Sequence, residues 1–215
     1  MLAQIRRKSS EVSDSLFVGH VRVHATHWGA VLGLPPCFIE MLLLVEDKRF
    51  SAHWGIDLLA IVRAAFADIA AGRLAEGGST LTQQLFDVRG VRSTRRDRSW
   101  LRKVQQVIWA MRQEQRMSKT SILREYLDSV YWGQDIFGLP EAARRYCNVK
   151  PADLNPAQSF FLAERIASPN AYYPGRVTEL LRRPPIAVLL DDESLMQQVR
   201  DLYVRHFSER PVDAG

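Results

Sequence analysis

The chain has 215 residues and a net charge of +5, from 29 Lys and Arg against 24 Asp and Glu. With 47% hydrophobic and 25% charged residues, its composition is that of an ordinary globular protein, which excludes a disordered chain, a collagen and a disulfide-rich miniprotein. The length suits one domain, or one domain with a short appendage, and is enough to bury a hydrophobic core.

Residues 1–34 are interpreted as an N-terminal arm or extension. The run from Val18 to His24 alternates apolar and polar side chains, a pattern that predicts a short strand. His20, His24 and His27 could suggest a metal site, but nearby carboxylate or cysteine partners are missing and a strand would turn His27 to the other face. We therefore expect an exposed strand or extended arm without a metal.

From the sequence as written we expect neither an export signal nor a membrane anchor. No stretch reaches the ~18–20 apolar residues that span a bilayer, and the charged start of the chain lacks the apolar run of a signal peptide behind it. Two cysteines, Cys37 and Cys147, have apolar neighbours and are expected to be buried free thiols.

The first predicted helix covers about residues 37–47 and is apolar nearly all round, which indicates a central, buried helix. It ends in Glu46 and Asp47. A carboxyl group in such an apolar setting should have a raised pKa, which suits a general base or acid, and His53 could orient it. The alternative interpretation is an ordinary ion pair with the cations that follow in the sequence.

A second helix is predicted from Asp57, its N-cap, to about Ala71. The segment from Gly77 to Gln84 then indicates a glycine turn that opens into a polar helix. Its glycines allow a ligand to approach the backbone, and a helix N-terminus attracts anions. The hydroxyl and amide side chains of this segment suit sugars or phosphate oxygens, whereas the alternative is a capped turn without a ligand.

Arginine makes up 24 of the 29 basic residues, and five of these arginines lie in a basic loop at 89–98. Because the planar guanidinium suits phosphate and carboxylate, an anionic partner is expected, such as nucleic acid, a phosphorylated ligand or a membrane surface. Genomic GC bias is the alternative. A helix over about 99–116 places Arg98 and Arg102 on one face, with Gln106 one turn further; a solvated charged face is the usual outcome of such a pattern.

The remainder of the chain is predicted to be helical. Ser118 caps a helix that ends at Gly133, a short helix follows from Pro140, and a capping box at 155–158 opens another helix. A last amphipathic helix covers about 192–206. Strand signals are weak, so the predicted fold class is mainly α.

Several motifs in chain order carry a family resemblance. They are Glu46-Asp-x-x-Phe-x-x-His-x-Gly55, Gly77-Gly-Ser-Thr-x-Thr-Gln-Gln84, Arg102-Lys103, Ser118-Lys119-x-x-Ile-Leu-x-x-Tyr126-Leu127, Val130-Tyr-Trp-Gly133, Pro140-Glu-Ala-Ala-Arg-Arg-Tyr146 and the segment 163–174. Over roughly residues 35–175 the chain resembles the family 51 glycosyltransferases. These are the peptidoglycan transglycosylase domains of bifunctional penicillin-binding proteins and their monofunctional relatives.

The resemblance implies a lysozyme-like, bilobal, mainly α fold in which a cleft separates a larger lobe from a small membrane-facing jaw subdomain. We assign residues 35–177 to this transglycosylase-like domain and 178–215 to a C-terminal helical extension. The implied reaction joins lipid II units: the 4-hydroxyl of the acceptor sugar attacks the anomeric carbon of the donor, undecaprenyl pyrophosphate leaves, and configuration inverts to give a β-1,4 glycan.

In this resemblance Glu46 is the catalytic residue, the general base on the acceptor hydroxyl. The implied substrate-binding residues are Asp47, Phe50, His53, Gly78, Ser79, Thr80, Gln83, Gln84, Arg98, Arg102, Lys103, Gln106 and Lys119. The implied partners are lipid II, the nascent glycan strand, a membrane surface and, in addition, a separate transpeptidase. Nucleic acid is not expected as a partner.

The chain departs from the family pattern on the donor side. Gln106 stands where the family has its second glutamate, and Asp87 stands where it has a lysine. An amide forms hydrogen bonds but holds a metal poorly. We therefore expect no required cofactor; a divalent cation, Mg or Mn, at the donor pyrophosphate is put in doubt by Gln106. The Arg-rich loop at 89–98 could compensate for the lost charge.

Four functions are compatible with these features. The first is an active but divergent transglycosylase, and the second is a relative that binds lipid II or glycan without turnover. A lysozyme-like lytic enzyme that uses Glu46 as general acid and a basic nucleic-acid binder are weaker alternatives. The resemblance implies a location at the outer face of the cytoplasmic membrane, where residues 57–71 and the stretch around Trp100 could lie in the interface.

Overall fold

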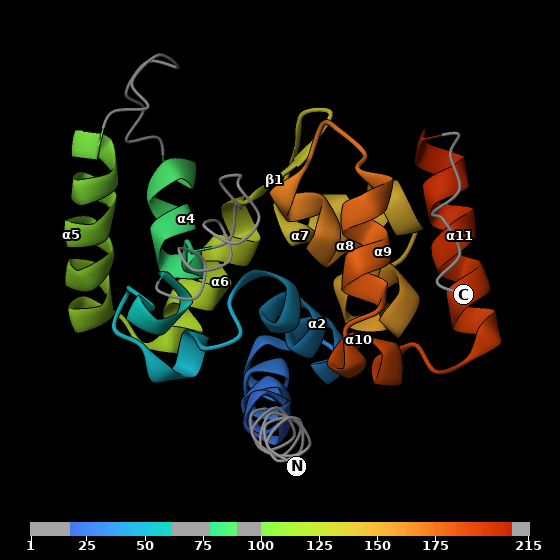
Figure 1. The fold of residues 1–215 in the computed structure, drawn as a ribbon, viewed down its shortest axis with the longest axis horizontal. Coiled ribbons are helices and arrows are strands. Elements are labelled where there is room, and N and C mark those ends of the chain that lie inside the picture. Colours follow the sequence, from blue (N-terminus) through green and yellow to red (C-terminus); the bar gives the residue numbers. More distant parts are fainter. Residues whose placement is uncertain (1–17, 62–77, 90–99, 208–215) are drawn as a thin grey trace, which may run out of the picture.

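The computed structural model describes residues 18–61, 78–89 and 100–207, and within these residues the chain is mainly helical (Figure 1). A helix over residues 18–32 comes first. The elements that follow are α2 (Pro36–Glu46), η1 (Phe50–Ala52), α4 (Leu81–Val88), α5 (Trp100–Arg116), α6 (Lys119–Ser129), β1 (Tyr131–Gly133), β2 (Ile136–Phe137), α7 (Leu139–Ala142), η2 (Ala143–Cys147), η3 (Pro151–Asp153), α8 (Pro156–Ala167), α9 (Pro174–Leu181), α10 (Pro184–Leu189) and α11 (Glu193–Phe207).

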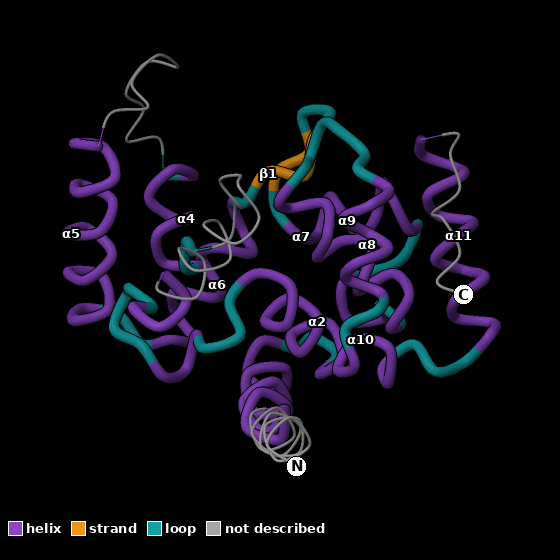
Figure 2. Tube along the Cα trace, in the orientation of Figure 1, coloured by secondary structure: helices purple, strands orange, loops and turns teal. Residues whose placement is uncertain are grey.

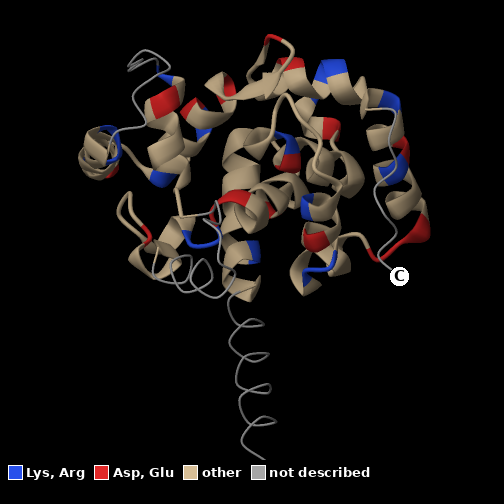
Figure 3. Ribbon diagram, turned by 45° about the horizontal axis from the view of Figure 1, so that its top comes forward, with Lys and Arg blue, Asp and Glu red and all other residues tan. Residues whose placement is uncertain are grey.

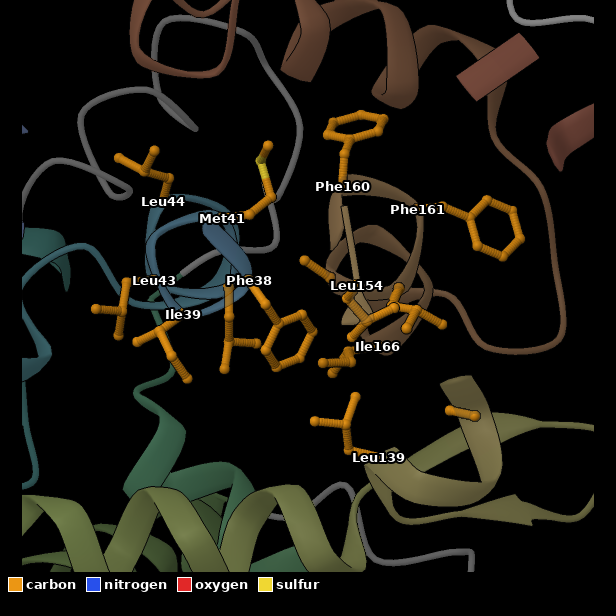
Figure 4. Close-up of a cluster of buried hydrophobic side chains, with 14 of the residues drawn as sticks. Phe38, Ile39, Met41, Leu43, Leu44, Leu139, Leu154, Phe160, Phe161 and Ile166 are labelled. Atoms are coloured by element: carbon orange, nitrogen blue, oxygen red, sulfur yellow. The ribbon is translucent and has the colours of Figure 1, made fainter. Parts of the chain in front are cut away.

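The hydrophobic core is built around α2 and α8, which pack against each other. In Figure 4, Met41 of α2 lies beside Phe160 of α8, Phe38 of α2 lies lower in the same cluster, and Leu139 of α7 is at the bottom. Seven of the eleven residues of α2 are buried, which confirms the prediction of a central helix that is apolar nearly all round. Because its core positions are filled, α2 is a rigid support for whatever stands at its C-terminal end.

The helices lie in two groups on either side of α2 (Figures 1 and 2). Helices α4 and α5 are side by side at one end of the long axis and contact α6. Helices α8, α9 and α11 form the group at the other end, where α11 packs on α8. Among the helices of the described residues, none is long and apolar enough to cross a membrane.

The predicted strand at 18–24 is wrong, because residues 18–32 form a helix. The apolar residues Val21, Ala25 and Trp28 recur at helical spacing and are all buried, and the ring of Trp28 meets Phe50 at 5.4 Å. A run of seven residues is too short to distinguish the two-residue repeat of apolar side chains in a strand from the 3.6-residue repeat in a helix. The three histidines follow one helix face, where partial burial and the charges of its histidine neighbours lower the pKa of His24.

Helix α6 is shorter than predicted, since it ends at Ser129 instead of Gly133. The apolar residues that seemed to prolong it form a two-stranded antiparallel hairpin, in which Gly133 faces Ile136 across a two-residue turn. Both turn residues, Gln134 and Asp135, have positive φ, as a tight hairpin turn requires. The predicted short helix from 140 is confirmed by α7 and η2.

The predicted helix caps are confirmed wherever the structure describes them. The Asp57 carboxylate accepts the backbone N–H of Ala60 at 2.9 Å, Ser118 accepts that of Ser121 at 3.1 Å, and Asn155 forms a full capping box with Gln158. The rest of the predicted helix to Ala71 lies outside the described residues, as does most of the basic loop at 89–98. The predicted last helix at 192–206 is confirmed by α11.

Both cysteines are free thiols, as predicted. Cys147 is buried, and burial raises the pKa of its thiol to about 12. Cys37 is only partly buried and lies near the hydroxyl of Ser159. Burial raises the pKa of the Cys37 thiol as well. Neither thiol therefore has the lowered pKa that makes a cysteine reactive at neutral pH.

Replacing Gly133 by alanine is expected to destabilise the fold. Its φ is +94°, and an added Cβ would lie 2.1 Å from the carbonyl oxygen of Pro169. We expect a loss of about 3 kcal/mol in the free energy of unfolding, measured by urea denaturation.

The matched control is Gly175→Ala, because Gly175 lies in α9 and no atom comes within 4 Å of a Cβ added there. This control should be neutral or up to ~1 kcal/mol more stable than the wild type. Equal urea midpoints for the two variants would contradict the role given to Gly133.

Candidate active site

Glu46 stands at the C-terminal end of α2, and its side chain is only 7% exposed. The amide nitrogen Nε2 of Gln84 donates a hydrogen bond to its Oε2 at 2.9 Å. The other oxygen, Oε1, is buried and has no hydrogen-bond partner among the described residues. One oxygen of the carboxylate is thus held in place while the other remains available to a ligand.

Gln84 is itself oriented by Tyr126 of α6. The Tyr126 hydroxyl donates to the amide oxygen of Gln84 at 2.7 Å, and this turns the amide nitrogen toward Glu46. Burial and the nearby charge of Glu46 raise the pKa of Tyr126 well above its ordinary value, so the phenol keeps its proton and remains a donor. Two helices, α4 and α6, therefore fix the position of one carboxylate oxygen on a third.

Burial raises the pKa of the Glu46 carboxyl above its ordinary value, and the charges of Glu164 and Asp47 act in the same direction. The hydrogen bond from Gln84 and the charge of Arg176 lower it. A raised pKa makes the carboxylate a stronger base, which suits the role of a general base.

Asp47 joins the end of α2 to the start of α4. Its carboxylate accepts Nε2–H of His53 at 3.0 Å and the backbone N–H of Leu81 at 2.9 Å. Because the N–H of Gly55 donates to Nδ1 of His53, the imidazole proton lies on Nε2, toward Asp47. The Thr80 hydroxyl donates to the Gly55 carbonyl at 2.8 Å, which fixes the same loop on α4.

A second polar cluster lies between α4 and α5 and consists of Ser79, Asp87, Arg102, Lys103 and Gln106. The guanidinium of Arg102 donates to Oδ1 of Asp87 at 2.6 Å, and the amide of Gln106 donates to its Oδ2 at 2.9 Å. The ammonium of Lys103 donates to Gln106 Oε1 at 2.9 Å and to Ser79 Oγ at 2.8 Å. We call these five residues the α4–α5 cluster.

The charges of the α4–α5 cluster partly cancel. Partial burial lowers the pKa of Lys103, whereas the charge of Asp87 raises it. Gln106 is buried, and its amide nitrogen also donates to the backbone carbonyl of Gln83 at 2.9 Å. Two cations face one carboxylate here, which leaves a positive surplus of one where the two helices meet.

Lys119, another predicted binding residue, is held inside the protein. Its ammonium donates to the His53 carbonyl and to Glu114, both at 2.7 Å, and lies 4.4 Å from the ring centroid of Phe50. Burial lowers its pKa and the partner Glu114 raises it. Phe50 itself is fully buried. Both residues support the loop that carries His53.

The structure brings most of the predicted site residues together around one turn of α4. The side chain of Gln84 faces Glu46, whereas the backbone carbonyl of Gln83 and the carboxylate of Asp87 accept hydrogen bonds from Gln106 of α5. The side chain of Gln83 instead accepts the backbone N–H of Thr80 in a capping box. The start of α4 thus links the buried carboxylate to the α4–α5 cluster. Gly78 lies just before that turn, beside Ile61. Arg98 and Gly77 lie outside the described residues.

Three residues near Glu46 have no role assigned from the sequence. Tyr126 and Glu164 lie within motifs that carry the family resemblance but are not among the implied site residues, and Arg176 follows a Pro-Gly break. A buried acid in α8 was a usable signal, because an unpaired buried carboxylate is costly and therefore implies a partner. No local pattern shows that Arg176 returns to the end of α2.

Comparisons with known proteins agree on one family. The family described as transglycosylase matches residues 17–191. Penicillin-binding protein 1F of Bacillus subtilis is 38% identical over 141 residues, which are 66% of this chain and 19% of that protein. Penicillin-binding protein 1A of Neisseria flavescens is 33% identical over 162 residues, 75% of this chain and 20% of that protein. The corresponding protein of Neisseria gonorrhoeae is 32% identical over 170 residues, which are 78% of this chain and 21% of that protein. The chain spans about a fifth of the length of these relatives.

Proposed function

Because the chain belongs to the transglycosylase family, the family 51 glycosyltransferase domains related to those of penicillin-binding proteins, we propose that it polymerises lipid II into β-1,4 glycan with inversion. The observation that carries this proposal is Glu46, a buried carboxylate with one oxygen fixed by Gln84 and the other without a hydrogen bond among the described residues. That arrangement suits a base that must remove a proton from one hydroxyl in a defined position.

On the acceptor side, Glu46 takes the proton of the 4-hydroxyl as the oxygen of that hydroxyl forms a bond to the anomeric carbon of the donor. The bond from that carbon to the pyrophosphate oxygen breaks, and its electron pair leaves with undecaprenyl pyrophosphate. Because attack and departure occur on opposite faces, configuration inverts. Asp47 and His53 act by holding the end of α2 against α4.

On the donor side, Arg102 and Lys103 neutralise the pyrophosphate as it leaves. Stabilising developing negative charge in this way is typically worth ~3–4 kcal/mol per donor. Lys103 is held by Ser79 and Gln106 within the same cluster, so its ammonium does not have to be positioned by the substrate.

A divalent cation fits the α4–α5 cluster poorly. The one carboxylate there, Asp87, is bound at both oxygens by Arg102 and Gln106, and the amide oxygen of Gln106 is taken by the ammonium of Lys103. A metal ion would have to displace these cations. We therefore propose that the reaction requires no cofactor and route no step through a metal.

Binding of lipid II without turnover is a second candidate function. It is favoured by Asp87 and Gln106, which stand where the family has a lysine and a glutamate. A nucleic-acid role gains no support from the described helices, along which basic and acidic residues are mixed (Figure 3).

We further propose that the chain works at the outer face of the cytoplasmic membrane, where its substrate lies, with a separate transpeptidase as partner. In this proposal α4 and α5 belong to the smaller lobe of a lysozyme-like fold. The loop before Asp57 touches α5, because a Cβ on Gly55 would lie 2.7 Å from the backbone of Ala110. Large apolar side chains are exposed on residues 54–61 and on α5: Trp54, Leu58, Leu59, Ile61, Trp100, Leu101, Val104, Ile108 and Met111.

Exposed apolar side chains on α5 are expected to contribute to membrane binding. The double variant Trp100→Ser/Leu101→Ser should reduce the fraction of protein that sediments with anionic vesicles at low salt by several-fold, because burying each side chain in the interface is worth about 1.5–3 kcal/mol. Phe137→Ser is the control, since Phe137 is also exposed but lies on the hairpin. Equal sedimentation of all proteins, or none for the wild type, would contradict the membrane proposal.

The function is tested with labelled lipid II and the full chain. The proposed activity produces glycan strands that a muramidase specific for β-1,4 links reduces to disaccharide units. Retention of labelled lipid II without polymer would support the binding function instead. Shortening of finished glycan strands would indicate a lytic enzyme.

A further inference from the structure

Arg176 lies in the first turn of α9, directly after Tyr173, Pro174 and Gly175. Its side chain returns to the end of α2, where Nη2 stands 3.9 Å from Oε1 of Glu46. Its Nε stands 3.8 Å from Oε1 of Glu164 on α8. Arg176 is thus a cation between the proposed base and a second, fully buried carboxylate.

Glu164 has its own partners and does not need Arg176 for neutralisation. The guanidinium of Arg165 donates to Glu164 Oε2 at 3.0 Å, and the hydroxyl of Tyr203 donates to the same oxygen at 2.8 Å. The side chains of Glu164 and Arg165 are completely buried. The charge of Arg176 therefore remains available to Glu46.

Oε1 of Glu46, which faces Nη2 of Arg176 at 3.9 Å, is buried and has no hydrogen bond among the described residues. Nε of Arg176, which faces Glu164, is likewise buried without a hydrogen bond. Oε2 of Glu46 is already bound by Gln84. Oε1 is consequently the oxygen that can receive a proton from a substrate hydroxyl, and Arg176 stands beside it.

We propose that Arg176 is a positioning residue for the general base: its guanidinium is the counter-ion of Glu46 and assigns the proton-accepting role to Oε1. This inference rests on the proposed glycosyl transfer. It adds a residue that acts through Glu46 and that belongs to α9, outside the motifs that carry the family resemblance.

The charged and titratable groups that surround Glu46 support this role. Asp47 on the same segment and Glu164 on α8 raise the pKa of Glu46, as does its burial, and Tyr126 on α6 keeps its proton. Arg176 is the cation that lowers this pKa. Without Arg176 the pKa of Glu46 must rise further, so Glu46 would keep its proton up to a higher pH. A protonated Glu46 cannot act as a base, so the reaction would need that higher pH.

The test compares Arg176→Gln and Arg176→Lys with the wild type in lipid II polymerisation from pH 5 to 9. The acidic limb of the pH–rate profile should move to higher pH in Arg176→Gln. Its rate should be several-fold low at pH 6 and should return toward the wild-type rate at pH 9, whereas the lysine variant should lie in between. Arg182→Gln is the control, because Arg182 is exposed at the end of the same helix.

A profile that only falls in height, with its acidic limb unmoved, would overturn the proposal, because a merely structural role lowers the rate at every pH. A carbon-13 NMR titration of Glu46 in the full chain provides a readout that does not depend on activity. If the wild type makes no polymer, the proposed function fails. The inference is then tested by the NMR titration alone: it is supported if Arg176→Gln raises the pKa of Glu46, with Arg176→Lys in between, and contradicted if neither variant changes that pKa.

Discussion

Replacement of Glu46 by glutamine is expected to reduce lipid II polymerisation by at least about 100-fold, because general-base catalysis typically contributes 10²–10⁴ in rate. Glutamine keeps the size of the side chain and can still accept the hydrogen bond from Gln84. It cannot take a proton. The loss should therefore appear in kcat, measured from initial rates at saturating lipid II, with binding of lipid II largely retained.

The same substitution should change how stability depends on pH. Since the folded-state pKa of Glu46 is raised, the folded protein binds a proton that the unfolded chain has already released. The wild type therefore loses stability as the pH rises from the unfolded toward the folded pKa, and the glutamine variant does not. Urea unfolding should show that the free energy of unfolding of the variant, relative to that of the wild type, is greater at pH 8 than at pH 4.

Glu193→Gln is the matched control for this experiment. Glu193 is an exposed glutamate on α11 that pairs with Arg200, and its loss should leave the polymerisation rate unchanged. An active Glu46→Gln protein would show that another group removes the proton. Inactivity of both variants would point to a general effect of the substitutions on folding.

Exchange of Gln106 for glutamate alone is expected to lower the polymerisation rate, although it restores the residue of the family pattern. The amide of Gln106 donates to Asp87 and to the carbonyl of Gln83. A carboxylate would instead present an acceptor to both: the carbonyl of the buried Gln83 would lose its donor, and the exposed Asp87 would face a like charge. Leaving a buried group unpaired costs roughly 1–3 kcal/mol. If that cost falls on the transition state, the rate should drop by about 5- to 150-fold.

The double variant Asp87→Lys/Gln106→Glu should recover much of this loss, because a lysine at 87 would face the new carboxylate. A double-mutant cycle of the four proteins measures the coupling directly. A higher rate for Gln106→Glu alone would show that the natural α4–α5 cluster is impaired and would favour the function of binding without turnover. Additive effects would show that positions 87 and 106 do not act as a pair.

Local signals account for the parts of the fold that the sequence predicts well. The central helix α2 was recognisable from its continuous apolar run, and the caps at Asp57, Ser118 and Asn155 from single side chains with donors three residues away. Residues 18–24 alone do not distinguish a strand from a helix; the helical spacing is clear only when Trp28 is included, and the packing of Trp28 against Phe50 joins distant segments.

Part of the candidate site is likewise predictable from local sequence patterns, and part is not. Glu46 and Gln84 come from segments that the sequence singled out, and the structure places them 2.9 Å apart. Arg176 is 130 positions from Glu46 in the chain and approaches it only because the tertiary fold brings the first turn of α9 to the end of α2. Ion pairs between remote segments follow from tertiary packing, which no local pattern encodes. The roles of all these residues remain predictions.

The most direct measurement is the release of undecaprenyl pyrophosphate from labelled lipid II by the full chain, counted against the glycosidic bonds formed in the same sample. We predict one pyrophosphate released for each β-1,4 bond, with both lost in Glu46→Gln. Lipid II that binds to the protein and stays intact, under conditions in which a known transglycosylase polymerises it, would contradict the account.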